Sequence, residues 1–281
     1  MLPVRGPARA VALALVMLLL ACSASPPPFH KVDGAWHYRD TRIEGADTAT
    51  FAPLDDHYAK DRARVYYGAS RRDGQEYFSI RHDGVLAIDG ADPASLRVLR
   101  LGYAKDVHAV YHDGVRFAVR DPASFDLLEY GFAKDRAVGY WHQAQIAGSD
   151  GPSFTHVDTH YAKDARRAYH VDFVVDGGAR GPVVRAVVLA DADVATFVAL
   201  DDGYAKDSRQ VWHRGRLVSR APGTLAVLPY DYARTATEVF HRGERVADAD
   251  AASFAVLDPP TDDADARDAR GAFRAGRRVA R

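Results

Sequence analysis

The apolar positions of the chain recur with a long period, and a short motif, Y-A-K-D, marks each copy. Uninterrupted copies are about 28–29 residues long, a spacing typical of repeat proteins. Five residues after the Asp comes an aromatic residue, usually preceded by valine, which is a composition typical of strands. The motif and its variants lie at 58–61, 103–106, 132–135, 161–164, 204–207 and 232–235. The aromatic residues that follow are Tyr66, Tyr111, Tyr140, Tyr169, Trp212 and Phe240.

Each copy predicts a short helical turn followed by a β-hairpin. Two copies begin with D-P-A-S, at Asp92 and Asp121, where Asp is a favoured N-cap and Pro suits the first helical position. A first strand ends near Y-A-K, a tight turn follows at K-D, and a second strand carries the aromatic residue. The expected fold is mainly β: tandem β-hairpin repeats with short helical turns between them, in an open solenoid-like array. A closed propeller-like ring is the alternative, although propeller blades normally need four strands and about 40 residues.

Two copies are longer than the others, and both are extended after the aromatic strand, near residues 68–90 and 171–190. Each insertion predicts an extended hairpin, with turns at His82–Gly84 and at Gly177–Gly181. Insertions in repeat proteins project from one face, which is often the binding face. The two hairpins are therefore the candidate working parts of the surface.

Both ends of the repeat region keep part of the pattern. Trp36–Tyr38 begins a half unit that lacks its first strand, whereas Asp268, Phe273, Gly276 and Val279 keep the spacing of a complete copy and predict a closing strand. We expect residues 34–281 to form a single repeat domain.

The N-terminus has the composition of a signal sequence. Arg5 and Arg9 precede an apolar run of about a dozen residues, too short for a membrane-spanning helix. The end of this run, L-L-A followed by Cys22, resembles the lipobox of bacterial lipoproteins. That resemblance implies a signal peptide at 1–21, a lipidated Cys22 that anchors the chain in a membrane, and a proline-rich tether at 22–33. It also implies the bacterial cell envelope. The outer membrane is favoured, because no inner-membrane retention signal of the Asp type follows the cysteine.

Composition excludes several classes of function. Cys22 is the one cysteine of the chain, so lipidation leaves no thiol for a disulfide, for thiolate chemistry or for cysteine-ligated zinc. The net charge of −1 and the interspersed charges argue against a nucleic-acid partner, which would need clustered Lys and Arg.

The charged pair of the motif suggests a structural turn. One Asp per turn can cap backbone N–H groups, with a Lys beside it to balance its charge. Calcium is the alternative, but it needs six to eight oxygen ligands. These residues are Lys60, Asp61, Lys105, Asp106, Lys134, Asp135, Lys163, Asp164, Lys206 and Asp207.

Other candidate chemistry is also better explained by structure. Four histidines follow the strand aromatic and are expected on the opposite, exposed face, one unit or more apart and too far to share a zinc ion. The strand aromatics could stack on sugars, but we expect them to form the core between units. We therefore expect no cofactor and no metal site. The histidines are His112, His170, His213 and His241.

The recurring Y-A-K-D-x-x-x-V-Y-Y pattern, with D-P-x-S-F between copies, resembles the DKNYY family of bacterial repeat proteins, many of which are lipoproteins. The resemblance covers about Trp36 to Arg281. The chain departs from the family name in having K-D where K-N is common. The family supplies no catalytic residue that could be carried over to this sequence.

The sequence therefore predicts a non-enzymatic envelope lipoprotein, a repeat scaffold that presents a binding surface to another envelope protein or to a glycan. An envelope enzyme that acts on polysaccharide or peptidoglycan is the alternative. That alternative requires a pocket in which two carboxylates, or a His-Asp pair, converge on a substrate.

Overall fold

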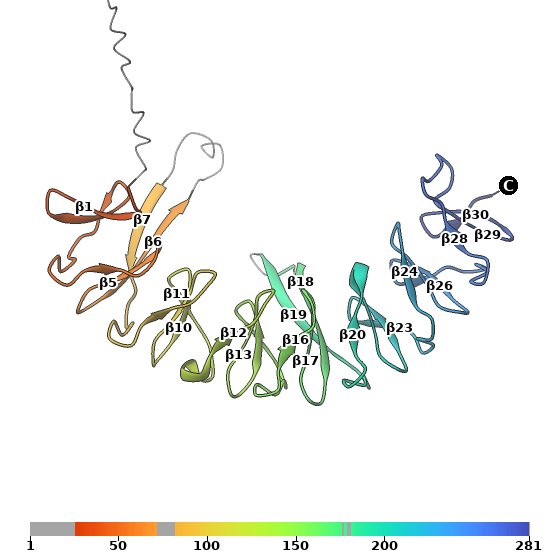
Figure 1. Cartoon of the computed structure of the whole chain (residues 1–281), viewed down its shortest axis with the longest axis horizontal. Helices are drawn as coiled ribbons and strands as arrows, with labels where there is room; N and C mark the ends of the chain where they lie inside the picture. Colours follow the sequence, from red (N-terminus) through yellow and green to blue (C-terminus); the bar gives the residue numbers. More distant parts are fainter. Residues whose placement is uncertain (1–25, 72–81, 176, 179–180, 281) are drawn as a thin grey trace, which may run out of the picture.

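The computed structural model describes residues 26–71, 82–175, 177–178 and 181–280. In this part of the chain eight antiparallel sheets follow one another, the first with three strands and the others with four. Figure 1 shows the sheets stacked in chain order along an open arc whose two ends lie far apart. The expected open array of β-hairpin repeats is confirmed, and the alternative of a closed ring is wrong.

The strands of each sheet are short, and their bounds are as follows. The first sheet contains β1 (Phe29–Val32), β2 (Ala35–Tyr38) and β3 (Thr41–Arg42). The next three contain β4 (Ala52–Pro53), β5 (Tyr58–Lys60), β6 (Val65–Arg71) and β7 (His82–Ala87); β8 (Arg97–Val98), β9 (Tyr103–Lys105), β10 (Val110–His112) and β11 (Val115–Phe117); β12 (Asp126–Leu127), β13 (Phe132–Lys134), β14 (Gly139–Trp141) and β15 (Ala144–Ile146).

The second half of the array continues in the same way. The fifth and sixth sheets contain β16 (Thr155–His156), β17 (Tyr161–Lys163), β18 (Ala168–Val175) and β19 (Pro182–Leu189); β20 (Val198–Ala199), β21 (Tyr204–Lys206), β22 (Val211–His213) and β23 (Arg216–Ser219). The last two contain β24 (Ala226–Leu228), β25 (Tyr232–Arg234), β26 (Val239–His241) and β27 (Glu244–Arg245); β28 (Ala255–Val256), β29 (Ala266–Asp268), β30 (Gly271–Arg274) and β31 (Arg277–Arg278).

The predicted hairpin forms the centre of each unit, and a further short strand flanks it on each side. In the third sheet β9 pairs with β10, while β8 and β11 pair with their outer edges. The fourth strand forms because Asp113-Gly114 makes a two-residue turn, with φ of 50° and 74°. Such hairpin turns need these left-handed conformations.

In the described residues helical structure is limited to short turns. A 3₁₀ helix, η2 (Pro122–Ser124), lies at one of the D-P-A-S sequences, and η3 (Asp201–Gly203) precedes β21. In the described ranges no helix is long and apolar enough to cross a membrane.

The first unit is more complete than the sequence indicated. β1 pairs with β2 along its whole length, so the unit does not lack its first strand, and the repeat domain begins at Phe29, inside the expected tether. Phe29 takes the place of the motif tyrosine, and its ring centroid lies 5.0 Å from that of Tyr38. The strand was missed because F-H-K-V keeps only the aromatic residue and the lysine of Y-A-K-D. At the other end the closing strand is confirmed as β31, next to the fully buried Phe273.

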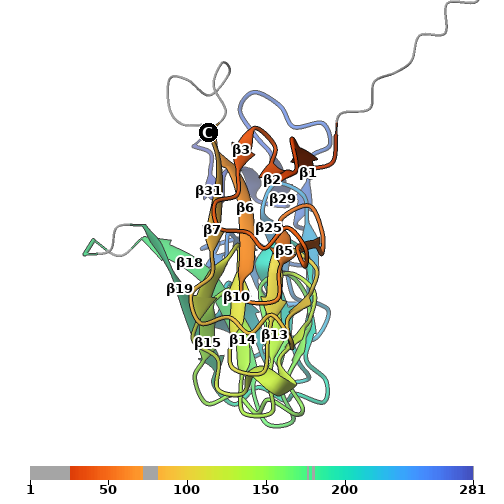
Figure 2. The same ribbon diagram turned by 90° about the vertical axis from the view of Figure 1, so that its left-hand side faces the viewer.

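Both insertions form extended hairpins from the third and fourth strands of their units. The turn expected at His82–Gly84 is wrong, because these residues lie in β7 and pair with β6. The residues that join β6 to β7 are outside the described part of the chain. In the second hairpin β18 ends at Val175 and β19 begins at Pro182, which fits the turn expected at Gly177–Gly181. Figure 2 shows this hairpin projecting sideways from the array.

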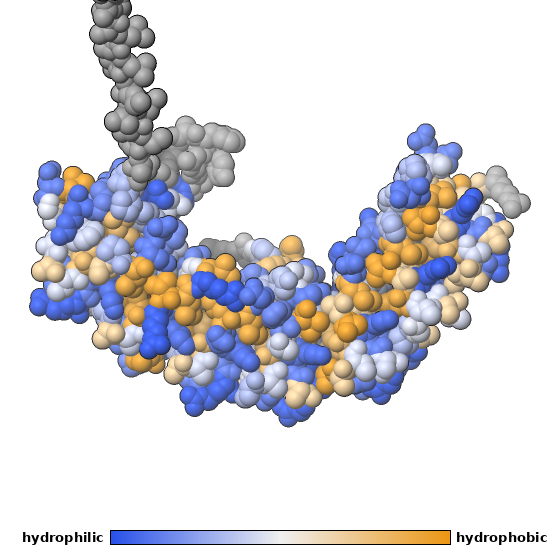
Figure 3. Space-filling model, viewed as in Figure 1, coloured by the Kyte–Doolittle hydropathy of each residue, from blue (hydrophilic) through white to orange (hydrophobic). Residues whose placement is uncertain are grey.

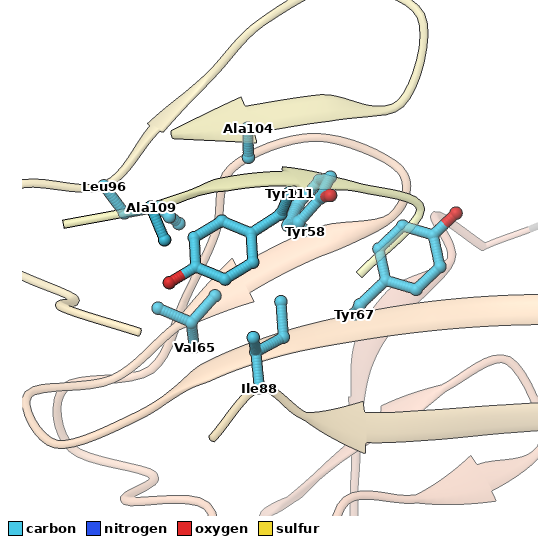
Figure 4. Close-up of a cluster of buried hydrophobic side chains, with 8 residues drawn as sticks. All are labelled: Tyr58, Val65, Tyr67, Ile88, Leu96, Ala104, Ala109 and Tyr111. Atoms are coloured by element: carbon cyan, nitrogen blue, oxygen red, sulfur yellow. The ribbon is translucent and has the colours of Figure 1, made fainter. Parts of the chain in front are cut away.

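The core is divided among the interfaces between successive units. Figure 4 shows one such interface, where Tyr58 and Val65 of the second unit pack with Ala104 and Tyr111 of the third. Similar clusters of buried side chains lie between the later units. Each unit therefore depends on its neighbours for burial of its faces, as expected of a repeat array.

Candidate functional site

The motif aspartates are buried acceptors that hold each turn together. Asp164 is typical: its Oδ1 accepts hydrogen bonds from the backbone N–H groups of Arg166 (2.7 Å) and Arg167 (2.8 Å). Its Oδ2 accepts from the N–H of Asp150 (2.9 Å) and the hydroxyl of Tyr169 (2.6 Å). Burial raises the pKa of this carboxyl, but the hydrogen bonds outweigh burial, and the pKa lies below its usual value. Both oxygens are occupied by protein donors, and the same arrangement recurs at Asp61, Asp106 and Asp135.

The sequence suggested that each motif lysine balances the charge of its neighbouring aspartate, but in the described residues four of these lysines have other partners. Their ammonium groups instead bind backbone carbonyls in the first turn of the following unit. Lys60 donates to Pro93 O (2.7 Å), Lys105 to Phe125 O (2.7 Å), and Lys163 to Val194 O (3.0 Å). Lys134 makes the equivalent bond, to Phe154 O. In the sixth unit Lys206 ends β21 as the other motif lysines end their strands, and Asp207 accepts a hydrogen bond within the turn that follows. Lys60, Lys105, Lys134 and Lys163 therefore join one unit to the next.

The strand aromatics lie in the core between units. All are at most 1% exposed, so none presents a face on which a sugar could stack. The residues are Tyr66, Tyr111, Tyr140, Tyr169, Trp212 and Phe240.

The repeated histidines are not on an exposed face, contrary to expectation. Each packs against the motif tyrosine opposite it; the ring centroids of Tyr204 and His213 are 4.6 Å apart. At His170, His213 and His241 the turn glycine of the following unit lies against the other side of the ring; a Cβ at Gly243 would be 2.3 Å from Nδ1 of His213. Burial, with Arg214 and Arg216 nearby, lowers the pKa of His213, and burial lowers the pKa of His170 to about 4. The rings of His170 and His213 are therefore neutral at physiological pH.

In each unit the turn between the third and fourth strands and the loop just before the Y-A-K-D motif lie at the same end of the sheet. These turns and loops follow one side of the arc, and we call this side the concave edge. Figure 1 shows the β6–β7 hairpin, which replaces such a turn, rising on the inner side of the arc. The K-D turns lie at the opposite, convex edge, because adjacent strands are antiparallel. Figure 3 shows the hollowed inner side of the arc, with hydrophilic and hydrophobic residues interspersed over the face in view.

Each inserted hairpin creates a hollow with the units that follow it. The hollow beside β18–β19 is the larger, about 800 Å³, and takes residues from three successive units. The hollow beside β6–β7 is about 450 Å³ and is bounded by Tyr67, Leu86 and, from the next unit, Asp113. The two insertions occur at the same repeat position and therefore produce equivalent hollows on the concave edge.

The hairpin that bounds the larger hollow is packed against the preceding unit. On one face the Phe173 ring lies 4.7 Å from Trp141 and 5.0 Å from His142, measured between centroids. Arg185 and Val187 of β19 line the hollow. The contacts with the preceding unit therefore hold one wall of the hollow in place.

Four arginines and three carboxylates line this hollow, and four of these charges are paired. Arg216 donates to Glu244 (2.6 Å) and to Gly243 O (2.8 Å), and Arg242 donates to Asp231 (2.8 Å). The remaining charged groups are Arg185, Arg214 and Asp202, all exposed. Among the described residues the guanidinium groups of Arg185 and Arg214 have no hydrogen-bond or ion-pair partner. The arrangement can bind an anionic group. In the described ranges no cluster of three or more His, Cys, Asp or Glu could hold a metal ion.

Bulky side chains in left-handed backbone also lie on the concave edge. Leu101, Tyr130 and Tyr230 have φ of 59°, 56° and 59° and are 66%, 54% and 41% exposed. Large residues rarely adopt this conformation, and such strain is concentrated at binding sites. These residues were not predicted from the sequence, although their shared position, two residues before the motif aromatic, was an available signal.

The comparisons with known proteins agree with the repeat architecture. The model of the DKNYY family matches two overlapping stretches, residues 29–172 and 70–228. Both matches end before residues 232–235, where Y-A-K-D becomes Y-A-R-T. The searches of curated proteins and of solved structures returned no match.

Proposed function

Since the chain belongs to the DKNYY family, we propose that it is a lipid-anchored, non-enzymatic scaffold of the bacterial cell envelope whose concave edge binds another envelope protein or a glycan. The observation that carries this proposal is the pair of inserted hairpins. Both extend the same turn of the repeat, and each creates a hollow with the next unit. A surface assembled from successive units suits an extended ligand.

The charges in the larger hollow support binding rather than acid–base catalysis. Asp231 and Glu244 each accept a hydrogen bond from an arginine. Both carboxylates are therefore already engaged by a protein donor. A glycosidase needs one carboxyl that donates a proton and a second that faces the sugar. The enzyme that the sequence left as an alternative therefore finds less support here than a binding scaffold does.

The anchor is tested at Cys22, which lies outside the described residues. We expect Cys22→Ser to move the protein from the membrane fraction to the soluble fraction and to abolish incorporation of labelled fatty acid, because lipid chains at this residue supply the membrane affinity. Ser23→Ala is the matched control and should leave both measurements unchanged. Equal membrane recovery of Cys22→Ser and the wild type would contradict the anchor.

The binding surface is tested by restoring the second hairpin to ordinary length. In the inserted hairpin His170 pairs with Val187. In the next unit the equivalent pair is His213 and Arg216, which are connected by the two-residue turn Arg214-Gly215. Replacing residues 171–186 with Arg-Gly therefore gives a unit of normal length. We expect at least a tenfold loss of captured partner after cross-linking in intact cells, since the wall of the larger hollow is removed.

The controls separate binding from folding. Arg62→Ala and Arg166→Ala alter exposed side chains at K-D turns, on the convex edge, and should capture the partner normally. The shortened variant lacks Phe173, whose ring packs against Trp141. Its stability is therefore measured by urea unfolding, to establish that the array remains folded. A folded variant that captures as much partner as the wild type would overturn the proposed surface.

A further inference from the structure

We infer that the hollow beside β18–β19 is a binding site for an acidic sugar, held through its carboxylate or phosphate by Arg185 and Arg214. This inference rests on the proposed function and specifies a glycan as the ligand. Arg185 lies on the inserted hairpin and Arg214 in the turn of the next unit. The two guanidinium groups therefore come from two elements that meet only in the folded array.

The position of Arg214 is fixed by its own unit. Its backbone N–H donates to Gly203 O at 2.8 Å. A Cβ at Gly203 would lie 3.0 Å from Cγ of Arg214, so the stem of the arginine packs over this glycine. The guanidinium group is exposed at the hollow and has no protein acceptor among the described residues. Arginine binds carboxylate and phosphate oxygens through two parallel N–H donors.

The neighbouring charges favour an anion at this place. Arg216 and Arg242 are neutralised by Glu244 and Asp231, so these pairs neither attract nor repel strongly. His213 lines the same hollow and is neutral, since its pKa is lowered by burial and by the adjacent arginines. The positive charge available to a ligand therefore comes from arginine, and it persists over the whole physiological pH range.

Asp202 is the third charged group of the hollow with no ion-pair or hydrogen-bond partner in the part of the chain that the structure describes, and it favours a ligand that also carries hydroxyl groups. This carboxylate lines the same hollow and would repel a simple polyanion. A sugar hydroxyl could donate to it while the acidic group of the same sugar binds the arginines. The volume of about 800 Å³ lies in the range of small-molecule sites and exceeds what a single oxyanion fills.

The inference is tested by calorimetric titration of the whole folded protein with four probes. These are an oligosaccharide of uronic acid, a neutral oligosaccharide of the same length, a sugar phosphate and inorganic phosphate. We expect the uronate, the sugar phosphate or both to bind, with the neutral sugar at least tenfold weaker and with affinity falling as salt is added. Binding of one acidic sugar alone identifies its acidic group as the one recognised.

Substitutions locate the site. Arg185→Ala and Arg214→Ala should each weaken binding about tenfold, and the double variant more, because each removes a charge-assisted hydrogen bond. Both side chains are exposed, so folding should be unaffected. Arg166→Ala, on the convex edge, is the matched control and should bind normally.

Three results would overturn the inference: no binding of either acidic sugar at millimolar concentration, binding of inorganic phosphate alone, or equal affinity in the double variant. These failures are distinct from failure of the proposed function. Capture of an envelope partner that still depends on residues 171–186 would then indicate a protein ligand.

Discussion

Asp164→Ala is expected to destabilise the array by about 4 kcal/mol, a large fraction of the stability of a typical domain. The carboxylate accepts four hydrogen bonds. Its alanine replacement removes the acceptor of the half-buried Asp150 N–H and the close acceptor of the buried Tyr169 hydroxyl, whose other acceptor, Gly148 O, lies 3.5 Å away. Each buried, unsatisfied donor costs about 1–3 kcal/mol. The N–H groups of Arg166 and Arg167 are nearer to solvent and contribute less.

Two further variants calibrate this effect in urea unfolding followed by tryptophan fluorescence. Asp164→Asn keeps one acceptor oxygen and should cost about half as much. Asp126→Ala removes an exposed carboxylate on β12 and should change the free energy of unfolding by less than about 0.5 kcal/mol. If Asp164→Ala and Asp126→Ala cost the same, the motif aspartate does not hold the turn in the way described.

The same carboxylates determine how stability changes with pH. The folded-state pKa values of Asp61, Asp106, Asp135 and Asp164 are lowered, so the unfolded chain binds protons more readily. Their contribution is fully present above the unfolded value of 3.8 and is lost as the pH falls below it. In the Asp164→Asn variant the loss of stability below pH 3.8 should be shallower than in the wild type.

The second large effect is expected at the contact between units. Gly243→Ala should cost about 3 kcal/mol, because φ is 72° and the new Cβ would lie 2.3 Å from Nδ1 of the His213 ring. The strained backbone contributes about 1 kcal/mol for a residue other than glycine. The overlap with a packed ring contributes about 2 kcal/mol more.

Gly90 provides a matched control, because it has the same φ of 72° and an added Cβ would meet no atom within 4 Å. Gly90→Ala should therefore cost only about 1 kcal/mol, through the backbone alone. The difference between the two variants, measured by urea unfolding, reports the packing of one unit on the next. Equal costs would show that Gly243 is required for its turn and not for the stacking of units.

Much of this architecture could be predicted from the sequence, because the repeat places residues in register. The central hairpin, the Asp-capped turn and the two extended hairpins each follow from a local pattern. Outside the two insertions, the flanking strands were missed because they are only two to four residues long and carry little pattern of their own. The dipeptide Asp113-Gly114 is nonetheless a favoured two-residue hairpin turn, and it could have predicted that a fourth strand follows.

The histidines show where local reasoning fails. Alternation along a strand correctly places His213 and Trp212 on opposite faces of the sheet. In a stacked array, however, both faces are covered by neighbouring units, so the face opposite the aromatic is also packed. Gly243 of the next unit covers His213, and Gly215 covers His170. An exposed face can be assumed only where one side of the sheet lacks a neighbour.

The larger hollow could not be read from the sequence at all. Arg214 and Arg242 share the H-R-G sequence of the turn between third and fourth strands, but Arg185 lies on the inserted hairpin and shares no motif with them. The stacking of units and the length of β18–β19 bring them together. The position of the insertion was predicted, but the charge of the hollow depends on which turns become its neighbours.

The central claim is that the concave edge, and the β18–β19 hairpin in particular, is the binding surface. The most direct test compares the envelope material cross-linked to the wild-type protein and to the variant in which Arg-Gly replaces residues 171–186. We predict at least a tenfold loss of captured material from a variant that remains folded and membrane-bound. Undiminished capture by that variant would contradict the claim.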